Sequence, residues 1–204
     1  DNFMNHHILL NHISKSYNGQ IIFSDLCLSI PYGEITAITA PSGYGKTTLL
    51  RLFMGLETPD TGIITGLNGQ KKSAVFQEDR LCEDFSALAN IKLTAVNYTE
   101  SEILSAMEQI ALYDCAKKPV KELSGGMKRR IAILRALLAD YDLLFLDEPF
   151  KGLDKETKDL VIKYTGQLIA GKTVIFTTHD HTEISALHAT NEISLPEVSG
   201  RTSF

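Results

Sequence analysis

A glycine-rich segment followed by a lysine and two threonines is the first group of residues whose types could do chemistry. It reads Ala-Pro-Ser-Gly-Tyr-Gly-Lys-Thr-Thr over residues 40–48, between an apolar run at 34–40 and a helical pattern that ends near Gly55. Glycines let backbone N–H groups turn toward a phosphate, and a helix N-terminus adds partial positive charge. In such a loop Lys46 reaches the terminal phosphates and the Thr47 hydroxyl ligates Mg²⁺. The segment therefore predicts a phosphate-binding loop.

Two adjacent carboxylates, Asp147 and Glu148, follow the apolar residues 143–146. Parallel α/β sheets bind their ligands at the C-terminal ends of strands, where this pair would lie. Asp147 would then hold the Mg²⁺ shell through water, and Glu148 would orient or deprotonate an attacking water. Taken alone, the pair is equally consistent with two solvated acids that close a strand.

A third segment, Leu-Ser-Gly-Gly-Met at residues 123–127, precedes another helical pattern. Ser124 is a good N-cap, and Gly125 and Gly126 leave a bare helix N-terminus onto which a phosphate can pack closely. An ordinary capped helix is the simpler interpretation of this segment when it is considered by itself.

The elements that must position these segments alternate between strand and helix patterns. Two strand-like runs joined by Asn18-Gly19 predict a hairpin near the N-terminus. After residue 123, helices alternate with buried strands, and Asp154 caps one of the helices. This order predicts a mostly parallel sheet with covered faces.

The middle of the chain, residues 81–123, reads as helical and carries Thr99 and Glu102 at the spacing of a capping box. A strand pattern resumes afterwards, which favours a helical insertion over a separate domain. We therefore expect a single α/β domain over residues 1–204, with residues 1–80 and 124–204 forming the core and residues 81–123 the helical subdomain.

Composition excludes several classes of protein. The 204 residues are 44% hydrophobic and 22% charged, which suits one folded domain and argues against disorder. A net charge of −5 makes a nucleic-acid-coating role improbable. The chain lacks both a bilayer-spanning apolar run of about 18 residues and the N-terminal pattern of a secretory signal. Its three cysteines form no CxxC pair, which favours buried thiols in a reducing cytosol.

At this order and spacing, the three segments resemble those of the ATP-binding cassette (ABC) ATPases, in which Leu-Ser-Gly-Gly is the signature. The resemblance runs from Tyr17 to about Glu183. It implies an α/β P-loop NTPase fold: a mostly parallel sheet core, an N-terminal antiparallel β subdomain and an inserted helical subdomain. Two positions depart from the family pattern, because Ala40 stands where the loop begins with glycine and Met127 where the signature continues with glutamine.

The resemblance also implies roles for single residues. Tyr17 would stack on adenine, Gln77 would sense Mg²⁺ and a transmembrane partner, Asp154 would communicate between two ATPase subunits, and His179 would contact the γ-phosphate. The implied nucleotide-binding set is Tyr17, Ser42, Gly43, Gly45, Lys46, Thr47, Thr48 and Gln77; the metal set is Thr47, Gln77 and Asp147; the catalytic set is Lys46, Glu148 and His179; and Ser124, Gly125 and Gly126 would act in trans on the partner's nucleotide.

The activity that the resemblance implies is hydrolysis of ATP with Mg²⁺, in a head-to-tail dimer with a second copy or a homologous subunit. Such a dimer would dock on integral-membrane permease subunits at the cytoplasmic face of the membrane, and a solute-binding protein is a further partner that an importer would use. No nucleic acid is expected. Short matches at residues 75–81 and 147–150 resemble importers of nitrate, sulfonate or taurine-like solutes. Leu81, Phe85 and Leu88 would form a groove for a partner helix or a small core of their own.

Three other interpretations remain open at this point. A soluble, non-transport ABC protein acting in DNA repair, chromosome organisation or translation is disfavoured by the acidic chain, which also lacks a long coiled-coil insertion and a second cassette. A regulatory nucleotide-binding module without turnover is disfavoured by intact Lys46, Asp147, Glu148 and His179. A small-molecule kinase would share the phosphate-binding loop but would not need the segment at Ser124.

Overall fold

The computed structural model describes residues 6–41, 43 and 45–196. An antiparallel sheet has the strand order β2-β1-β4, with β1 His7–Tyr17, β2 Gln20–Pro31 and β4 Thr61–Thr65. Asn18 and Gly19 connect the first two strands with φ angles of 48° and 81°. Positive φ at both central residues is what a type I′ hairpin turn requires, so the predicted hairpin is confirmed.

A second, parallel sheet has the strand order β5-β6-β7-β3-β8. Its strands are β3 Ile35–Thr39, β5 Lys72–Val75, β6 Leu143–Asp147, β7 Thr173–Thr178 and β8 Asn191–Ser194. Every residue of β3, β6 and β7 is buried, which explains why these strands consist of apolar residues and threonines, apart from Asp147 at the end of β6. The C-terminal ends of β6, β7 and β3 lie side by side, with Asp147 opposite Thr177 and Thr178 opposite Thr39.

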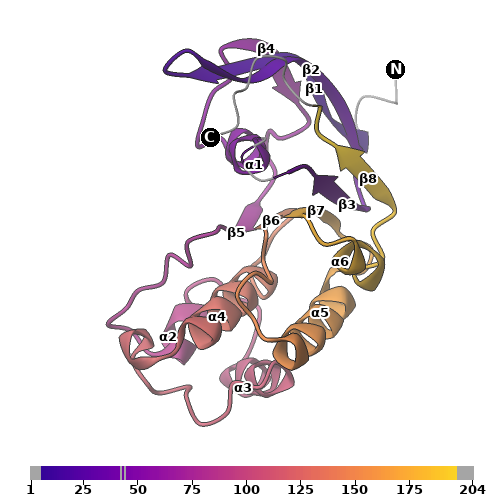
Figure 1. Cartoon of the computed structure of the whole chain (residues 1–204). Helices are drawn as coiled ribbons and strands as arrows, with labels where there is room; N and C mark the ends of the chain where they lie inside the picture. The colour runs from indigo at the N-terminus through magenta and orange to yellow at the C-terminus, as the bar shows by residue number, and fades with distance from the viewer. Residues whose placement is uncertain (1–5, 42, 44, 197–204) are drawn as a thin grey trace.

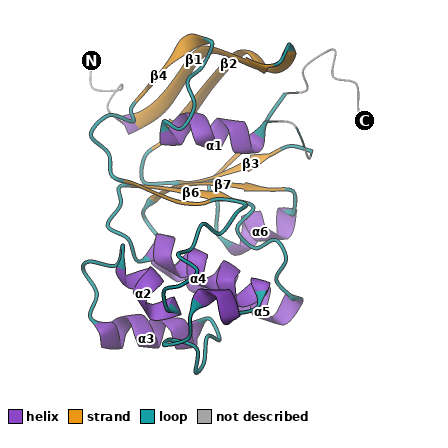
Figure 2. Ribbon diagram, turned by 90° about the vertical axis from the view of Figure 1, so that its left-hand side faces the viewer, coloured by secondary structure: helices purple, strands orange, loops and turns teal. Residues whose placement is uncertain are grey.

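Helices cover both faces of the parallel sheet (Figure 2). Helix α1, Lys46–Met54, lies between the two sheets, and its Phe53 ring stacks on Phe145 of β6 with ring centroids 5.8 Å apart. Helices α4 Gly125–Leu137, α5 Lys155–Ile169 and α6 His181–Ala186 lie on the opposite face. Because both faces are covered, the ends of the strands are where a ligand can reach the sheet.

The middle segment consists of α2 Ala87–Lys92, α3 Glu100–Gln109 and a short 3₁₀ turn, η2 Val120–Glu122. Helices α2 and α3 pack beside α4 (Figure 1) and share one apolar cluster with it. The capping box of Thr99 and Glu102 is formed, with the side chain of each accepting a hydrogen bond from the other's backbone N–H. The predicted combination of a parallel sheet, an N-terminal antiparallel sheet and inserted helices is confirmed, while the domain boundaries at 80 and 123 stay a prediction.

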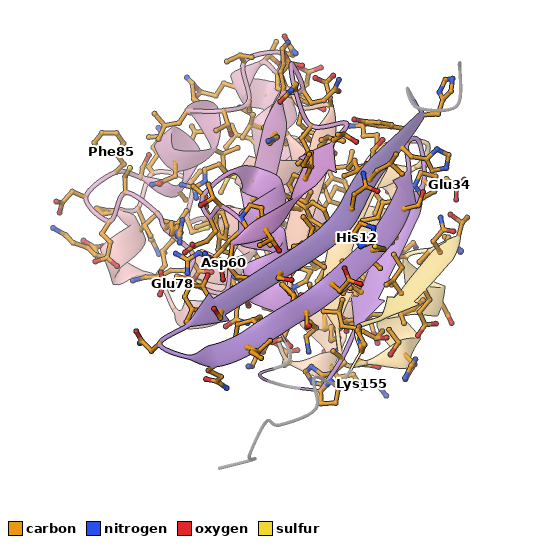
Figure 3. The ribbon with its side chains drawn as sticks, turned by 90° about the horizontal axis from the view of Figure 1, so that it is seen from above. His12, Glu34, Asp60, Glu78, Phe85 and Lys155 are labelled. Carbon is orange, nitrogen blue, oxygen red and sulfur yellow. The ribbon has the colours of Figure 1, made fainter. Side chains whose placement is uncertain are left out.

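Three expectations from the sequence need correction. Helix α6 and strand β8 are additions to the expected elements, because both are too short to give a clear periodicity. Cys27 and Cys82 are exposed, and Cys115 alone of the three is the expected buried thiol. Leu88 belongs to the core and Leu81 packs against it, whereas the side chain of Phe85 is exposed and projects from the edge of the molecule (Figure 3), so only two of the three residues are in a core and the groove stays a prediction. Among the described residues, no helix is long and apolar enough to cross a membrane.

Candidate functional site

The loop between β3 and α1 depends on glycine at its last position. Gly45 is the N-cap of α1 with φ 92°, and a Cβ atom there would lie 2.8 Å from side-chain atoms of Ile22 and Phe23. Both the backbone conformation and the space therefore exclude a side chain. Gly43 also has a positive φ, 84°. The predicted contact from Ser42 lies outside the described residues.

Lys46, the first residue of α1, folds its side chain back over this loop and is only 6% exposed. Its ammonium donates to the carbonyl of Ala40 and, at 3.4 Å, to that of Pro41. It also lies 3.7 Å from Oε1 of Glu148. The loop therefore holds a buried cation at its mouth, where a phosphate could replace the carboxylate as its partner. Thr48, two residues into the helix, is half-buried.

Asp147, at the end of β6, is completely buried and accepts two hydrogen bonds, one on each carboxylate oxygen. The Thr47 hydroxyl donates to Oδ2 at 2.8 Å, and the Thr177 hydroxyl donates to Oδ1 at 2.8 Å. Each hydroxyl in turn accepts an N–H: Thr47 from Gln77 Nε2 at 3.1 Å, and Thr177 from the Glu148 backbone at 2.9 Å. Because a carboxylate only accepts, both hydroxyls must donate to Asp147. This hydrogen-bond network joins four segments of the chain, which contain Thr47, Gln77, Asp147 and Thr177.

Glu148 lies beside two lysines and a histidine. Its carboxylate is 3.3 Å from His179 Nδ1, 3.5 Å from Lys151 Nζ and 3.7 Å from Lys46 Nζ. Burial by itself raises the pKa of Glu148, but the hydrogen bond with His179 and the charges of Lys151 and Lys46 outweigh burial, and the pKa is lowered. Glu148 is therefore ionised at neutral pH, as a group that accepts a proton must be.

The site also contains carboxylate, hydroxyl and amide oxygens, which are the ligand atoms that Mg²⁺ prefers. The Thr47 hydroxyl, the Asp147 carboxylate and the Gln77 amide lie within one hydrogen-bonded chain. In the described part of the chain, no three His, Cys, Asp or Glu side chains form a group that could hold a metal by themselves. The Asp147 carboxylate beside the Thr47 hydroxyl fits Mg²⁺, which is bound through one or two carboxylates and completes its shell with substrate phosphates and water.

The segment at the start of α4 is exposed. Ser124 is the N-cap and accepts the Met127 N–H at 3.3 Å. Among the described atoms, a Cβ on Gly125 would meet nothing within 4 Å, and one on Gly126 would meet only Leu153, at 3.8 Å. Met127, in place of the glutamine of the signature, packs against the apolar cluster under α4. Beside the two glycines is a cavity of about 420 Å³, which Gln77 and Glu148 also line.

Tyr17 and Asp154 have local partners in addition to their predicted roles. Tyr17 is 36% exposed at the end of β1, and the Lys15 ammonium lies 4.9 Å from its ring centroid. Asp154 caps α5 by accepting the Thr157 N–H at 3.0 Å. This backbone hydrogen bond is the largest cause that lowers the pKa of Asp154. Stacking on adenine and communication between subunits stay predictions for these two residues.

Two site residues are missing from the set that the sequence predicts. Thr177 looks like one more residue of a buried strand, and nothing in its neighbours distinguishes it from Thr178. Arg129 belongs to a basic run that suggests a solvated helix face, yet it is 6% exposed and donates to the backbone at the end of β6. A signal for Arg129 is present, because the helical spacing puts it on the apolar face with Ile133 and Ala136.

Comparisons with known proteins show which family the chain resembles. Residues 23–151 match the ABC transporter family. The Nod factor export ATP-binding protein I of Rhizobium johnstonii is 37% identical over 82% of this chain and 59% of its own length. The phospholipid transport ATP-binding protein MlaF of Escherichia coli is 33% identical over 86% of this chain and 74% of its own length. The aliphatic sulfonates import protein SsuB 3 of Rhodococcus jostii is 36% identical over 85% and 65%.

Solved structures resemble the fold over nearly its full extent. A bacterial ABC transporter cassette solved as a dimer has a TM-score of 0.79 and 27% identity, covering 92% of this chain and 94% of that one. A second structure of the same cassette, in a post-hydrolysis state bound to ADP and Pi, has a TM-score of 0.78. The chain spans about three-fifths of the Rhizobium johnstonii relative, 59% of its length. The chain therefore belongs to the ABC transporter family, as an ATP-binding cassette.

Proposed function

We propose that this chain binds and hydrolyses ATP as the ATPase subunit of a transporter. The observation that supports the proposal best is the network at Asp147. It joins the first turn of α1, through Thr47, to the end of β7, through Thr177, and it determines the backbone direction of Glu148. A phosphate-binding loop, a metal-binding carboxylate and an ionised base are thereby held together before any ligand arrives.

In the proposed reaction, Lys46 exchanges the Glu148 carboxylate for the terminal phosphates of ATP. The loop's glycines and the N-terminus of α1 bind the same phosphates through backbone N–H groups. Glu148 then orients the attacking water and accepts its proton, while His179, 3.3 Å away, positions Glu148 and contributes to charge stabilisation. Mg²⁺, held by Thr47, Gln77 and Asp147, supplies charge neutralisation on the phosphate oxygens when it is bound.

The second half of each site comes from a partner subunit. Ser124, Gly125 and Gly126 form an exposed N-terminus on a helix of 13 residues, where the partial positive charge favours a phosphate. A Cβ on Gly125 would meet no described atom of its own chain. A head-to-tail dimer would place this terminus against the ATP on the other subunit's Lys46. One solved cassette, described as a dimer in two structures, supports a dimeric arrangement.

The proposed partners are integral-membrane permease subunits, which would hold the dimer at the cytoplasmic face of the membrane; in an importer a solute-binding protein would deliver the cargo. The named relatives act in Nod factor export, sulfonate import and phospholipid transport, at 33% to 37% identity. Because export and import relatives match equally well, we propose transport without assigning a solute. All three are transporter proteins, which disfavours a role in DNA repair or translation.

Two variants test the proposal in the purified chain with Mg²⁺ and ATP. Glu148→Gln should keep ATP binding, accumulate an ATP-dependent dimer in sedimentation velocity and lose turnover, because an amide cannot accept the proton. Lys46→Ala should lose ATP binding and turnover together. Glu108→Gln and Lys117→Ala are matched controls at exposed positions of the helical segment and should behave like the parent. Turnover at the parent rate in Glu148→Gln would show that Glu148 does not have the assigned role.

A further inference from the structure

Arg129 is a buried guanidinium in the middle of α4, 6% exposed, with carbonyl acceptors on either side. On one side it donates to the three consecutive backbone carbonyls at and after the end of β6. Nη2 donates to Asp147 at 3.2 Å and to Glu148 at 2.9 Å, and Nε donates to Pro149 at 2.8 Å. The backbone that carries both site carboxylates is therefore attached to α4 through one side chain.

On its other side the same guanidinium holds the segment that follows β5. Nη1 donates to the Phe76 carbonyl at 2.5 Å and to the Gln77 carbonyl at 3.5 Å, and it pairs with the Asp79 carboxylate at 3.1 Å. This segment carries Gln77, whose amide donates to Thr47. Arg129 thus bridges residues 76–79 and 147–149, two segments that are far apart in the sequence.

The bridge contacts Glu148 at a point where the backbone is in an unusual conformation. The φ angle of Glu148, 44°, lies in the left-handed region, which a non-glycine residue adopts only when its surroundings enforce it. The backbone N–H of Glu148 donates to the Thr177 hydroxyl at 2.9 Å, and its carbonyl accepts from Arg129 at 2.9 Å and from the Lys151 N–H at 3.2 Å. Arg129 is one of the three groups that hold this conformation, and of the three it alone also binds residues 76–79. The direction of the Glu148 side chain depends on it.

We propose that Arg129 is a positioning residue that couples residues 76–79 to Glu148, so that a displacement of the segment carrying Gln77 changes the placement of the base. The proposal rests on the proposed function, because it assigns Glu148 as that base. It does not need Arg129 to touch ATP. The planar guanidinium provides five N–H donors in a fixed fork, which can hold two segments at once, whereas a lysine ammonium is a point charge on a flexible stem.

Arg130 is a matched control on the same helix. It too is a partly buried arginine that donates to three backbone carbonyls: Gly126 at 3.1 Å, Ile110 at 3.0 Å and Ala111 at 2.8 Å. None of these carbonyls belongs to residues 76–79 or 147–149. Arg130→Gln therefore reproduces the general cost of losing a carbonyl-binding arginine from α4 without removing the bridge.

The first measurement is hydrogen–deuterium exchange on the full chain without nucleotide. In Arg129→Gln, amides of residues 76–80 and of 147–151 should both exchange faster than in the parent. In Arg130→Gln, exchange should rise around Gly126, Ile110 and Ala111, and should not rise in residues 76–80 or 147–151. Faster exchange in just one of the two bridged segments of Arg129→Gln, or the same pattern in both variants, would overturn the coupling.

The second measurement is steady-state ATP hydrolysis. In Arg129→Gln, kcat should fall at least about tenfold, as is typical when a group that orients a site residue is lost, while KM for ATP should stay near the parent value, because Lys46 and the loop are untouched. In Arg130→Gln, kcat should fall less than in Arg129→Gln, because the one contact of Arg130 with the proposed site is the Gly126 carbonyl, and in the exposed control Lys117→Ala kcat should stay within about twofold of the parent. Equal losses of kcat in the two variants would contradict a positioning role.

Arg129→Lys keeps the proposal testable if Arg129→Gln fails to fold. It retains the charge but not the fork, so it should fold and still show a kcat below that of Arg130→Gln. Parent-like kcat and exchange in Arg129→Lys would overturn the proposal. A parent chain that does not hydrolyse ATP would instead refute the proposed function, while the exchange experiment would still decide whether Arg129 couples the two segments.

Discussion

The C-terminal edge of the parallel sheet and the N-terminus of α4 carry the two sets of motif residues, and the chain completes them to very different degrees. At the sheet edge, Lys46 and Asp147 are almost fully buried and bonded to their own chain. At the start of α4, Ser124 and Gly125 are exposed, and a Cβ on Gly125 would meet no described atom within 4 Å. The first region is organised in advance by folding, whereas the second has space for a group from another molecule.

This difference separates two kinds of sensitivity to mutation. At the sheet edge, polar atoms have determined partners, so even an isosteric change leaves a buried donor or acceptor unpaired. At the α4 terminus, a small added group costs the isolated chain nothing and is felt only when a partner docks. A substitution at the sheet edge should therefore alter the stability and turnover of the chain itself, whereas one of equal size at the α4 terminus should alter dimerisation. Three experiments measure that difference.

The largest effect is expected for Asp147→Asn. Each oxygen of Asp147 accepts the single hydrogen of a threonine hydroxyl, and each hydroxyl already accepts one N–H, from Gln77 or from Glu148. An asparagine has one acceptor oxygen and would point its NH₂ group at the other hydroxyl. We expect turnover to fall about 100-fold or more, since an oriented group is lost at the reacting centre, and unfolding free energy to fall by about 1–3 kcal/mol.

Turnover of ATP and urea denaturation measure the two effects of Asp147→Asn. Asp140→Asn is the control, because Asp140 is a carboxylate on the neighbouring loop that pairs with the exposed Lys71. Asp140→Asn should leave turnover near the parent rate and should change the unfolding free energy by no more than about 0.5 kcal/mol. An Asp147→Asn chain as stable and as active as the parent would mean that the sheet edge is no more organised than the α4 terminus.

An intermediate effect is expected from the same Gly→Ala change in each region. At Gly45 the methyl group meets Ile22 and Phe23 at 2.8 Å with φ at 92°, so the unfolding free energy should fall by about 1–3 kcal/mol. At Gly125 the methyl group meets no described atom, so stability should stay within about 0.5 kcal/mol of the parent. Thermal unfolding of the chain without nucleotide measures both values.

The Gly125→Ala change should weaken ATP-dependent dimerisation. In the Glu148→Gln background, which prevents turnover, adding Gly125→Ala should weaken ATP-dependent dimerisation at least about tenfold, or 1.4 kcal/mol. Sedimentation velocity with and without ATP gives this constant. Undiminished dimerisation would show that nothing packs against Gly125, and the proposed role of the α4 terminus would fail. Loss of monomer stability instead would show that the two regions are built alike.

Much of the sheet edge could be predicted because its signals are local. Gly45, Lys46 and Thr47 are consecutive, and so are Asp147 and Glu148. Each group follows a largely apolar run, which ends at Ala40 in one case and at Leu146 in the other, and the end of a buried parallel strand is where such a sheet binds ligands. The bounds of β3, α1 and β6 follow the expected segments within a few residues.

The partners of those residues could not be predicted, because they depend on the order of strands in the sheet. Thr177 reaches Asp147 only because β7 lies between β6 and β3. The left-handed φ of Glu148 has no signal in the sequence, since glycine, asparagine and aspartate are the usual markers of that conformation. Arg129 resembles one cation of a surface run in the sequence, and only packing shows that its side chain is buried.

The smallest effect is expected from acid. Asp180, next to His179 at the sheet edge, accepts from Lys158 at 2.8 Å and from the Thr182 hydroxyl and N–H. The hydrogen bond from Lys158, followed by those from Thr182, holds the pKa of Asp180 well below its usual range. The segment Ser124–Gly126 carries no carboxylate. Acid should therefore weaken the sheet edge through Asp180 and have no such target at the α4 terminus.

A carboxylate with a lower pKa in the folded chain binds fewer protons there than in the unfolded chain. Its contribution is complete above the unfolded pKa of about 3.9 and is lost as the pH falls further. The Asp180→Asn change mimics the protonated side chain and still caps α6, because asparagine is as good an N-cap as aspartate. Melting temperatures of the parent and Asp180→Asn should differ by a constant amount from pH 8 to about pH 5 and converge below about pH 4. Curves that stay parallel down to about pH 3 would show that the charge of Asp180 contributes nothing, and that the sheet edge is held by its neutral hydrogen bonds alone.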